Sequence, residues 1–331
     1  MKAQNWVGRP KLNVRVLIAG MALLSGANPA VAQEWPARNM TVEVPLGAGS
    51  ASDVIARVVM DQVAKQLGAT IVIENRPGAG GTIGANMVAK SAPDSYTALA
   101  YGGLASAHAL YKKLPYDTLN DLVPVIALGQ QPLVVVTPPS RGWKTLGDLI
   151  AAAKQKPGAL NYSSAGVGSA THFGAERLRA SAGFEAQHIP FRGAAEAVAE
   201  VIAGRIDFSV QPFATTLSLL RDGQLAGLAV SADQRASVMP QVPTTIESGL
   251  PVSSVYPFYS GLFVPAAMPR DIVDKLHREI ATALRAPAVQ AEFAQLGVEP
   301  MAMNQEQFAK FFRDDVAANL ELVKIAKIPT Q

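Results

Sequence analysis

TVEVPLGAGSASDVIARVVMDQVAKQLGATIVI, residues 41–73, predicts a strand, a glycine-rich loop, a helix and a second strand. The strands are Thr41–Val44 and Thr70–Ile73, and the apolar spacing of Ser52–Leu67 is that of a helix. Ser52 or Asp53 is expected to cap this helix, because a side-chain oxygen can accept from the free amides of its first turn. The apolar stripe comprises Val54, Ile55, Val58, Val59, Val63 and Leu67.

The next residues extend this pattern to a βαβαβ unit. Gly80–Lys90 is expected to open a second helix, and Tyr96–Tyr101 is expected to form a third strand. A parallel sheet with crossover helices follows from this order. A second α/β unit is predicted from the strands 133–136, 160–163, 186–189, 206–210 and 225–230, with helices 146–154, 171–181, 194–203 and 215–222 between them.

The C-terminal part returns to the same alternation. Residues 261–264 are expected to form a strand, followed by helices at 270–286, 288–295 and 304–326, the last capped by Asn304. Two α/β lobes without a long linker predict a cleft between them, where ligands usually bind.

Residues 1–32 have the pattern of a signal peptide. Four basic residues precede an apolar run at 16–27, and Ala30-Val31-Ala32 follows as a cleavage site. The run is too short for a membrane span, so we expect cleavage near Ala32 and export to the periplasm. Without this segment the chain has 25 basic and 26 acidic residues, and the net charge falls from +3 to −1. Nucleic acid is therefore not expected as a partner.

The composition excludes several kinds of chemistry. The chain has no Cys and only four His, without a pair at metal-ligand spacing, so neither a metal site nor a cofactor is expected. It lacks the nucleophile elbow, zinc-protease and phosphate-loop motifs. Ser169 and His172 could form a nucleophile pair, but three residues apart at a helix start is more typical of capping.

Three glycine-rich loops, 45–53, 75–82 and 163–172, lie at predicted strand-to-helix junctions. Glycine allows close approach to a ligand, and a helix N-terminus offers free amides and partial positive charge, a combination that binds anions. Each loop taken singly could equally be a turn that only satisfies chain geometry. Their occurrence in both lobes favours a carboxylate gripped from two sides.

These residues resemble a known family. VPLGAGSASDVIAR (44–57), NRPGAGGTIGANMVAK (75–90), YSSAGVGSATH (162–172) and HIPFRGAAEAVAEVIAGRIDF (188–208) are similar to segments of the solute-binding proteins of tripartite tricarboxylate transporters, also called the Bordetella uptake gene family. The resemblance extends in order over nearly the whole chain after the leader. It departs at Leu46, Ser50, Ser95 and Tyr259, where the family usually has other residues.

The resemblance implies a two-lobed α/β periplasmic binding protein of the second topological type, with lobe 1 at 33–133 and 255–331 and lobe 2 at 134–254. It implies a small carboxylate ligand, membrane transporter subunits as partners, a monomer and no catalysis. The contacts it implies are Leu46, Gly47, Ala48, Gly49, Ser50, Ser52, Asp53, Gly80, Gly166, Gly168, Ser169, Thr171, His172 and Asp207.

Alternatives stay open at this point. Asp207 would need a donor to sit beside a carboxylate, and it could instead be a surface acid in a turn. His172 could contact the ligand or only cap and pack against its loop. Arg57 is expected to pair with Asp53 four residues earlier. A secreted α/β enzyme of esterase or dehydrogenase type, or a ligand sensor for a signalling receptor, are the other functions considered.

Overall fold

The computed structural model describes residue 1 and residues 35–94, 96–301, 303–325 and 328–331. The predicted signal peptide lies almost wholly outside these residues, so its cleavage site stays a prediction. Among the described helices, none is both long and apolar enough to cross a membrane. Arg38–Gln331 forms one compact unit, to which the following description applies.

Lobe 1 is built on a five-stranded sheet in the order β2-β1-β3-β10-β4. Its strands are β1 (Met40–Val44), β2 (Ile71–Asn75), β3 (Thr97–Tyr101), β4 (Leu122–Gln131) and β10 (Phe258–Pro265). The first three strands are parallel, as predicted, whereas β10 is antiparallel to both β3 and β4. The glycine-rich loops after β1 and β2 therefore emerge at one edge of the sheet.

The helices of lobe 1 were predicted from the sequence, except for α4. They are α2 (Ala51–Leu67), α3 (Thr82–Ala89), α4 (Leu104–Leu110), α9 (Arg270–Ala283), α10 (Pro287–Leu296) and α11 (Gln305–Ile325), with a short 3₁₀ turn, η1 (Ala79–Gly81), before α3. Ile55, Val59 and Val63 are fully buried on α2. The N-cap of α2 is Ser50, and not Ser52 or Asp53 as predicted, because Ser50 is the residue with extended backbone whose hydroxyl accepts from Asp53 N.

Lobe 2 is built on a second five-stranded sheet in the order β7-β6-β8-β5-β9. The strands are β5 (Leu133–Thr137), β6 (Asn161–Ser164), β7 (Gln187–Pro190), β8 (Phe208–Pro212) and β9 (Ala226–Ser231), and the helices are α5 (Leu146–Gln155), α6 (Ala170–Ala182), α7 (Ala194–Ile202) and α8 (Phe213–Arg221). Strand β6 is parallel to β7 and β8, and β5 is antiparallel to β8 and β9. The short turns η2 (Pro139–Arg141) and η3 (Val252–Ser254) complete this part.

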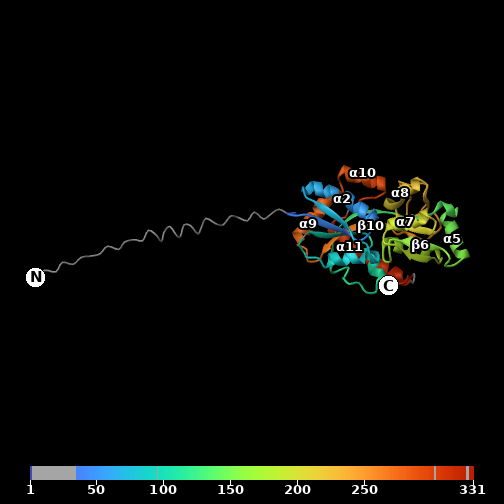
Figure 1. The fold of residues 1–331 in the computed structure, drawn as a ribbon, viewed down its shortest axis with the longest axis horizontal. Helices are drawn as coiled ribbons and strands as arrows, with labels where there is room; N and C mark the ends of the chain where they lie inside the picture. Colours follow the sequence, from blue (N-terminus) through green and yellow to red (C-terminus); the bar gives the residue numbers. More distant parts are fainter. Residues whose placement is uncertain (2–34, 95, 302, 326–327) are drawn as a thin grey trace. The chain divides into compact units, whose positions relative to one another are not determined.

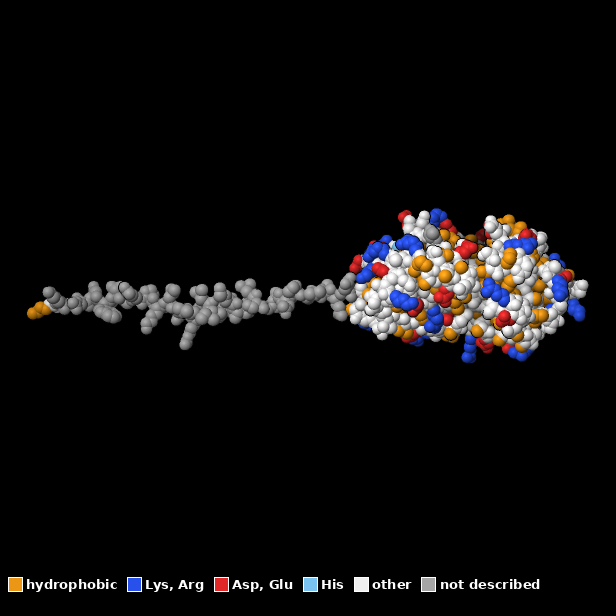
Figure 2. All heavy atoms as spheres, turned by 90° about the horizontal axis from the view of Figure 1, so that it is seen from above, with side chains coloured by type: hydrophobic (Ala, Val, Ile, Leu, Met, Phe, Trp, Pro, Cys, Tyr) orange, Lys and Arg blue, Asp and Glu red, His pale blue; other side chains and the backbone are white. Residues whose placement is uncertain are grey.

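The chain crosses between the two sheets twice (Figure 1). Only Pro132 separates β4 of lobe 1 from β5 of lobe 2, and residues 232–257 lead back from β9 to β10. The two-lobed α/β fold class is therefore confirmed, while the exact lobe boundaries stay a prediction. On the face shown in Figure 2, acidic and basic side chains are interspersed rather than gathered by sign.

Candidate functional site

The loops that follow the parallel strands of the two sheets meet between the lobes. In lobe 1 they follow β1, β2 and β3, and in lobe 2 they follow β6 and β7. Loops at the carboxyl ends of parallel strands share one edge of a sheet, which is where α/β proteins place their ligands. The structure therefore brings the first, second and third glycine-rich loops of the sequence to one interlobe cleft.

Glycines allow the two lobes to approach backbone to backbone. A Cβ on Gly80 would lie 1.7 Å from the carbonyl oxygen of Val167, and Gly80 has φ of +61°. A Cβ on Gly47 would lie 3.8 Å from Cα of Gly193. Only glycine fits at position 80 in this arrangement, so the glycine predicted there from sequence has a steric role in lobe closure.

Two hydroxyl groups of lobe 1 hold the third glycine-rich loop. Ser106 Oγ donates to the carbonyl of Gly168 at 2.9 Å, and Tyr111 Oη donates to the carbonyl of Val167 at 3.1 Å. Both residues were missed, because α4 was not predicted. Gly102-Gly103 could have pointed to this part of the site, because they follow the third predicted strand as the other glycine-rich loops follow their strands.

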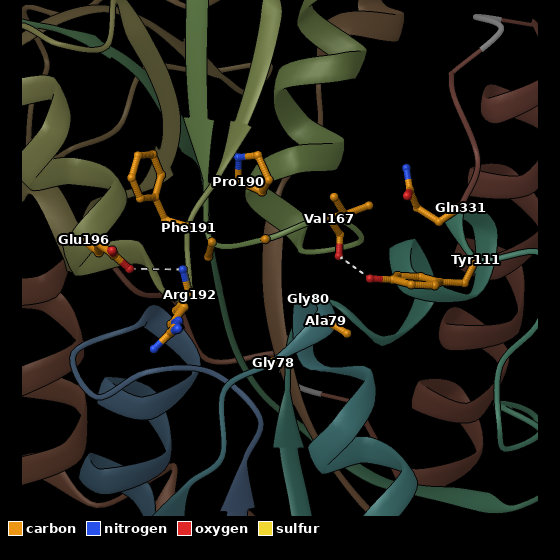
Figure 3. A pocket seen from close by; sticks show the side chains of 12 residues that line it. Gly78, Ala79, Gly80, Tyr111, Val167, Pro190, Phe191, Arg192, Glu196 and Gln331 are labelled. Carbon is orange, nitrogen blue, oxygen red and sulfur yellow. Dashed lines mark hydrogen bonds between the residues drawn. The ribbon is translucent and has the colours of Figure 1, made fainter.

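A cavity of about 420 Å³ lies at this meeting of the lobes (Figure 3). Gly78–Gly80 line it from lobe 1, and Ala165–Val167 and Pro190–Arg192 line it from lobe 2. Arg192 is exposed, and its backbone amide donates to Glu196 Oε2 at 3.2 Å. Its place two residues after the end of β7 could have been predicted, because that strand was found in the sequence.

The first glycine-rich loop is engaged mainly within lobe 1. The carbonyl of Leu46 accepts from the Asn75 side chain, and the carbonyl of Gly47 accepts from Ser50 N. Ala48 and Gly49 are exposed. Ser52 is fully buried, and its hydroxyl accepts from Gly102 N at 3.1 Å. Ser50 and Ser52 thus fix the loop.

Asp53 is a structural carboxylate in this structure. It accepts from Gly49 N at 2.9 Å, from Arg57 and from Asn75, and the predicted Arg57–Asp53 ion pair is confirmed. Burial alone would raise the pKa of Asp53, but the hydrogen bonds from Arg57, Gly49 and Asn75 lower it overall. The N-terminus of α2 therefore already faces a negative charge of the protein itself.

The third glycine-rich loop is fixed by hydroxyl groups at the start of α6. Ser169 is the N-cap, and its hydroxyl also donates to the carbonyl of Gly166 at 2.7 Å. Thr171 Oγ1 accepts from Ala165 N at 2.9 Å. Gly166 and Gly168 have φ of +115° and +84°, values that favour glycine. The amides of the first two residues of α6, Ala170 and Thr171, have no acceptor within the helix.

His172 packs beneath this loop. Its Nδ1 accepts from Gly168 N at 3.3 Å, and its ring stacks on that of His188 with centroids 3.9 Å apart. Burial lowers the pKa of His172 to about 4, and nearby Arg179 adds to the effect. His172 is thus a neutral hydrogen-bond acceptor near neutral pH. Its ring bonds the Gly168 amide, whereas the Ser169 hydroxyl bonds Gly166, so the two side chains are not arranged as nucleophile and base.

Asp207 is not brought together with the other candidates. It precedes β8, at the opposite end of the strand from the cleft loops. Its carboxylate accepts from Asn161 N at 2.7 Å and pairs with Arg141. The side chain is almost fully buried, so the alternative of a surface acid is wrong. Asp207 instead joins the starts of β6 and β8.

The cavity offers backbone amides, the Tyr111 hydroxyl and Arg192, groups that suit an anion, beside the carboxylate of Glu196. Among the residues that the structure describes, no group of three or more His, Asp or Glu could hold a metal ion.

Comparisons with known proteins agree with this geometry. The model of the tripartite tricarboxylate transporter family receptor matches residues 55–328. The chain belongs to this family. Protein BugT of Bordetella pertussis is 34% identical over 88% of this chain and 90% of its own length. A protein encoded in the tcbD-tcbE intergenic region of Pseudomonas sp. strain P51 is 33% identical over 91% of both chains.

Solved structures of the family share the fold. The periplasmic binding protein BugD superposes with a TM-score of 0.85 at 28% identity, covering 90% of this chain and 100% of BugD. MatC from Rhodopseudomonas palustris, solved with bound malate, gives a TM-score of 0.84 at 30% identity over 87% of this chain and 100% of MatC. R. palustris Rpa4515, solved with adipate, gives a TM-score of 0.86 at 27% identity, covering 90% of this chain and 100% of Rpa4515. The predicted family and binding-protein fold are confirmed.

Proposed function

We propose that this protein is a periplasmic receptor that captures a small carboxylate between its lobes and delivers it to the membrane subunits of a tripartite tricarboxylate-type transporter. The observation that carries the proposal is the convergence of glycine-rich loops from both lobes on one cleft, with Gly80 against Val167. Beside them lies the N-terminus of α6, where the Ala170 and Thr171 amides have no acceptor within the helix. The malate and adipate in the related structures support a carboxylate ligand.

Binding would favour the closed arrangement of the lobes, because only that arrangement offers both sets of contacts to the ligand. The ligand leaves chemically unchanged. The arrangement of Ser169 and His172 gives the enzyme alternative no nucleophile pair. A sensory role would use the same cleft and differs only in the membrane partner. We propose that the receptor acts as a monomer with the lobe division predicted from the sequence.

A thermal-shift screen against mono-, di- and tricarboxylates tests this function. A ligand at about 100 times its Kd adds roughly 2.7 kcal/mol to the free energy of unfolding, which corresponds to a rise of several degrees in Tm. The matched amides and alcohols serve as controls and should leave Tm unchanged. Chromatography of the incubated ligand should return it intact. A flat response to every carboxylate, or conversion of the ligand, would contradict the proposal.

A further inference from the structure

His188 lies on β7, in contact with the third glycine-rich loop (163–172). It pairs in register with Tyr162 of the parallel strand β6, so its side chain, that of Tyr162 and that of Ser164 point to the same face of the sheet. Helix α6 covers this face. The ring of His172 on α6 stacks on that of His188 with 9° between the planes, and the centroid of the Tyr162 ring lies 4.9 Å from that of His188. These contacts hold the His188 ring in one orientation.

The hydroxyl of Ser164 joins His188 to the backbone of the loop. Ser164 Oγ lies 2.6 Å from His188 Nε2 and accepts from Gly166 N at 3.2 Å. The hydroxyl proton can therefore go to His188 Nε2 or to the carbonyl of Gly166, which is 3.2 Å away. That carbonyl already accepts from Ser169 Oγ at 2.7 Å and from Ser169 N at 3.1 Å, and these two donors occupy its lone pairs. Ser164 thus donates to His188, and Nε2 is an acceptor.

The surroundings of His188 keep its ring neutral, as this bond requires. Burial lowers the pKa of His188 to about 3; His172 and Arg179 add to the effect, and Glu176 opposes it. The charge of Glu176 is itself engaged, because its carboxylate pairs with Arg179 at 2.6 Å and accepts from the Tyr162 hydroxyl. A charged imidazole would carry a proton on both nitrogens and could not accept from a hydroxyl.

The two stacked histidines hold the loop at two points that border the cleft. His188 holds Gly166 through Ser164, and His172 accepts directly from Gly168 N. Val167 lies between the two glycines, and both Gly166 and Val167 line the cavity of the cleft (Figure 3). Gly166 has φ of +115°, a conformation that its own side chain cannot restrict. The position of its amide therefore depends on the bond to Ser164.

We propose that His188 is a positioning residue for ligand binding: its Nε2 accepts from the Ser164 hydroxyl and thereby fixes the Gly166 amide at the wall of the cleft. In this role His188 touches no ligand and acts through Ser164. The role rests on the proposed function, in which the loop holds a carboxylate. The hydrogen bonds themselves are present without a ligand and can be measured without one.

Nitrogen NMR of the ligand-free protein at about pH 7 tests the acceptor directly. We expect the neutral tautomer of His188 that carries its proton on Nδ1 and leaves Nε2 unprotonated. The signals are assigned by their loss in His188→Gln. A His188 ring protonated at Nε2 would overturn the proposal, because it could not accept from Ser164.

Two substitutions of His188 separate the acceptor from the ring. His188→Phe keeps an aromatic ring for the stack but has no acceptor, whereas His188→Gln loses the ring and keeps an acceptor. In hydrogen exchange, the Gly166 amide should exchange at least about fivefold faster in His188→Phe than in the wild type, and within about twofold of the wild type in His188→Gln. The Gly168 amide is the internal control in His188→Phe, because it bonds to His172 and should keep its exchange rate.

Calorimetry with malate measures the consequence for binding. His188→Phe and Ser164→Ala should each weaken malate about fivefold or more, and His188→Gln should stay within about twofold of the wild type. The double variant should lose no more than Ser164→Ala alone, because both substitutions break the same bond. Circular dichroism and Tm verify that each variant is folded.

Equal losses of affinity in His188→Phe and His188→Gln would overturn the proposal, since the ring and not the acceptor would then matter. Unchanged exchange of the Gly166 amide in His188→Phe would overturn it as well. Failure of the wild type to bind malate or any carboxylate of the thermal-shift screen would contradict the proposed function instead, because the NMR and exchange measurements need no ligand.

Discussion

The loops before α2 and α6 are built on one plan. Their sequences are GAGSASD (47–53) and GVGSATH (166–172). The capping serines, Ser50 and Ser169, have nearly identical backbones, with φ/ψ of −67°/157° and −69°/157°. The glycine before each cap donates its amide to the last side chain of the motif, Asp53 in one loop and His172 in the other.

The two loops differ in charge at that last position. Asp53 places a carboxylate at the N-terminus of α2, whereas His172 places a neutral imidazole at the N-terminus of α6. A helix N-terminus that already faces an acid has little attraction left for a bound anion. We infer that the ligand carboxylate is held chiefly at α6, and that lobe 1 contributes closure through Gly80, Ser106 and Tyr111.

Gly80→Ala should have the largest effect on binding. Its Cβ would meet the Val167 carbonyl at 1.7 Å, so the closed state becomes inaccessible without a backbone shift. Carboxylate affinity should fall at least about a hundredfold, because apparent affinity scales with the closed fraction. Calorimetry with the ligand from the thermal-shift screen measures this.

Gly68→Ala is the matched control for Gly80→Ala. Gly68 also has positive φ, +58°, but nothing lies within 4 Å of its added Cβ. Both variants therefore carry similar backbone strain, roughly 1–2 kcal/mol. Equal losses of affinity in the two variants would show that strain, and not lobe contact, explains the result.

His172→Asp gives the loop before α6 the acidic residue that the loop before α2 has in Asp53. It should weaken carboxylate binding about tenfold or more, through repulsion at the α6 N-terminus. His172→Asn keeps a neutral acceptor for Gly168 N and should retain most of the affinity. Titrations of both proteins, with Tm values to verify folding, distinguish the charge effect. Similar losses for Asp and Asn would contradict the proposed role of the charge.

Tyr111→Phe should have a smaller effect. It removes the hydroxyl that donates to Val167 across the lobes but keeps the ring. A single neutral hydrogen bond contributes about 0.5–1.5 kcal/mol, so affinity should fall about two- to tenfold. Surface plasmon resonance should show the loss mainly as faster dissociation. An unchanged dissociation rate would remove Tyr111 from the closure contacts.

Asp53→Asn should change affinity least, because Asp53 is engaged within lobe 1. It should instead lower the free energy of unfolding at pH 7 by about 1–3 kcal/mol, the value of charged hydrogen bonds. The pKa of Asp53 is lowered in the folded protein, so its stabilisation is complete above about pH 4 and is lost as pH falls through the folded pKa. Urea unfolding at pH 7 and pH 3 should show the gap between the two proteins closing. A gap that persists at pH 3 would contradict this.

Most of the fold could be predicted from periodicity. The parallel strands of both lobes and their helices carry regular apolar patterns, and Asn304 caps α11 through Gln307 N as expected. Strand β4 was missed, since Pro124 and Gly129 interrupt its sequence. Helix α4 was missed because its seven residues are too short for a clear period.

The candidate site was predictable only where local sequence determines it. Glycines that follow strands were the sequence signal for Gly80, Gly166 and Gly168, and all three lie where the lobes meet. Asp207 pairs with Arg141, which is 66 residues earlier in the chain. Such a pairing has no local pattern, so the sequence could not predict that Asp207 is engaged at the start of β8, away from the cleft loops.

A crystal structure of the complex with the carboxylate that raises Tm most tests the central claim directly. We expect carboxylate oxygens within about 3 Å, hydrogen-bond distance, of backbone amides of the second-lobe loop, among them those of Val167, Ala170 or Thr171. A carboxylate that accepts hydrogen bonds from the first amides of α2, next to Asp53, and no hydrogen bond from the second-lobe loop would contradict the claim that α6 holds the ligand.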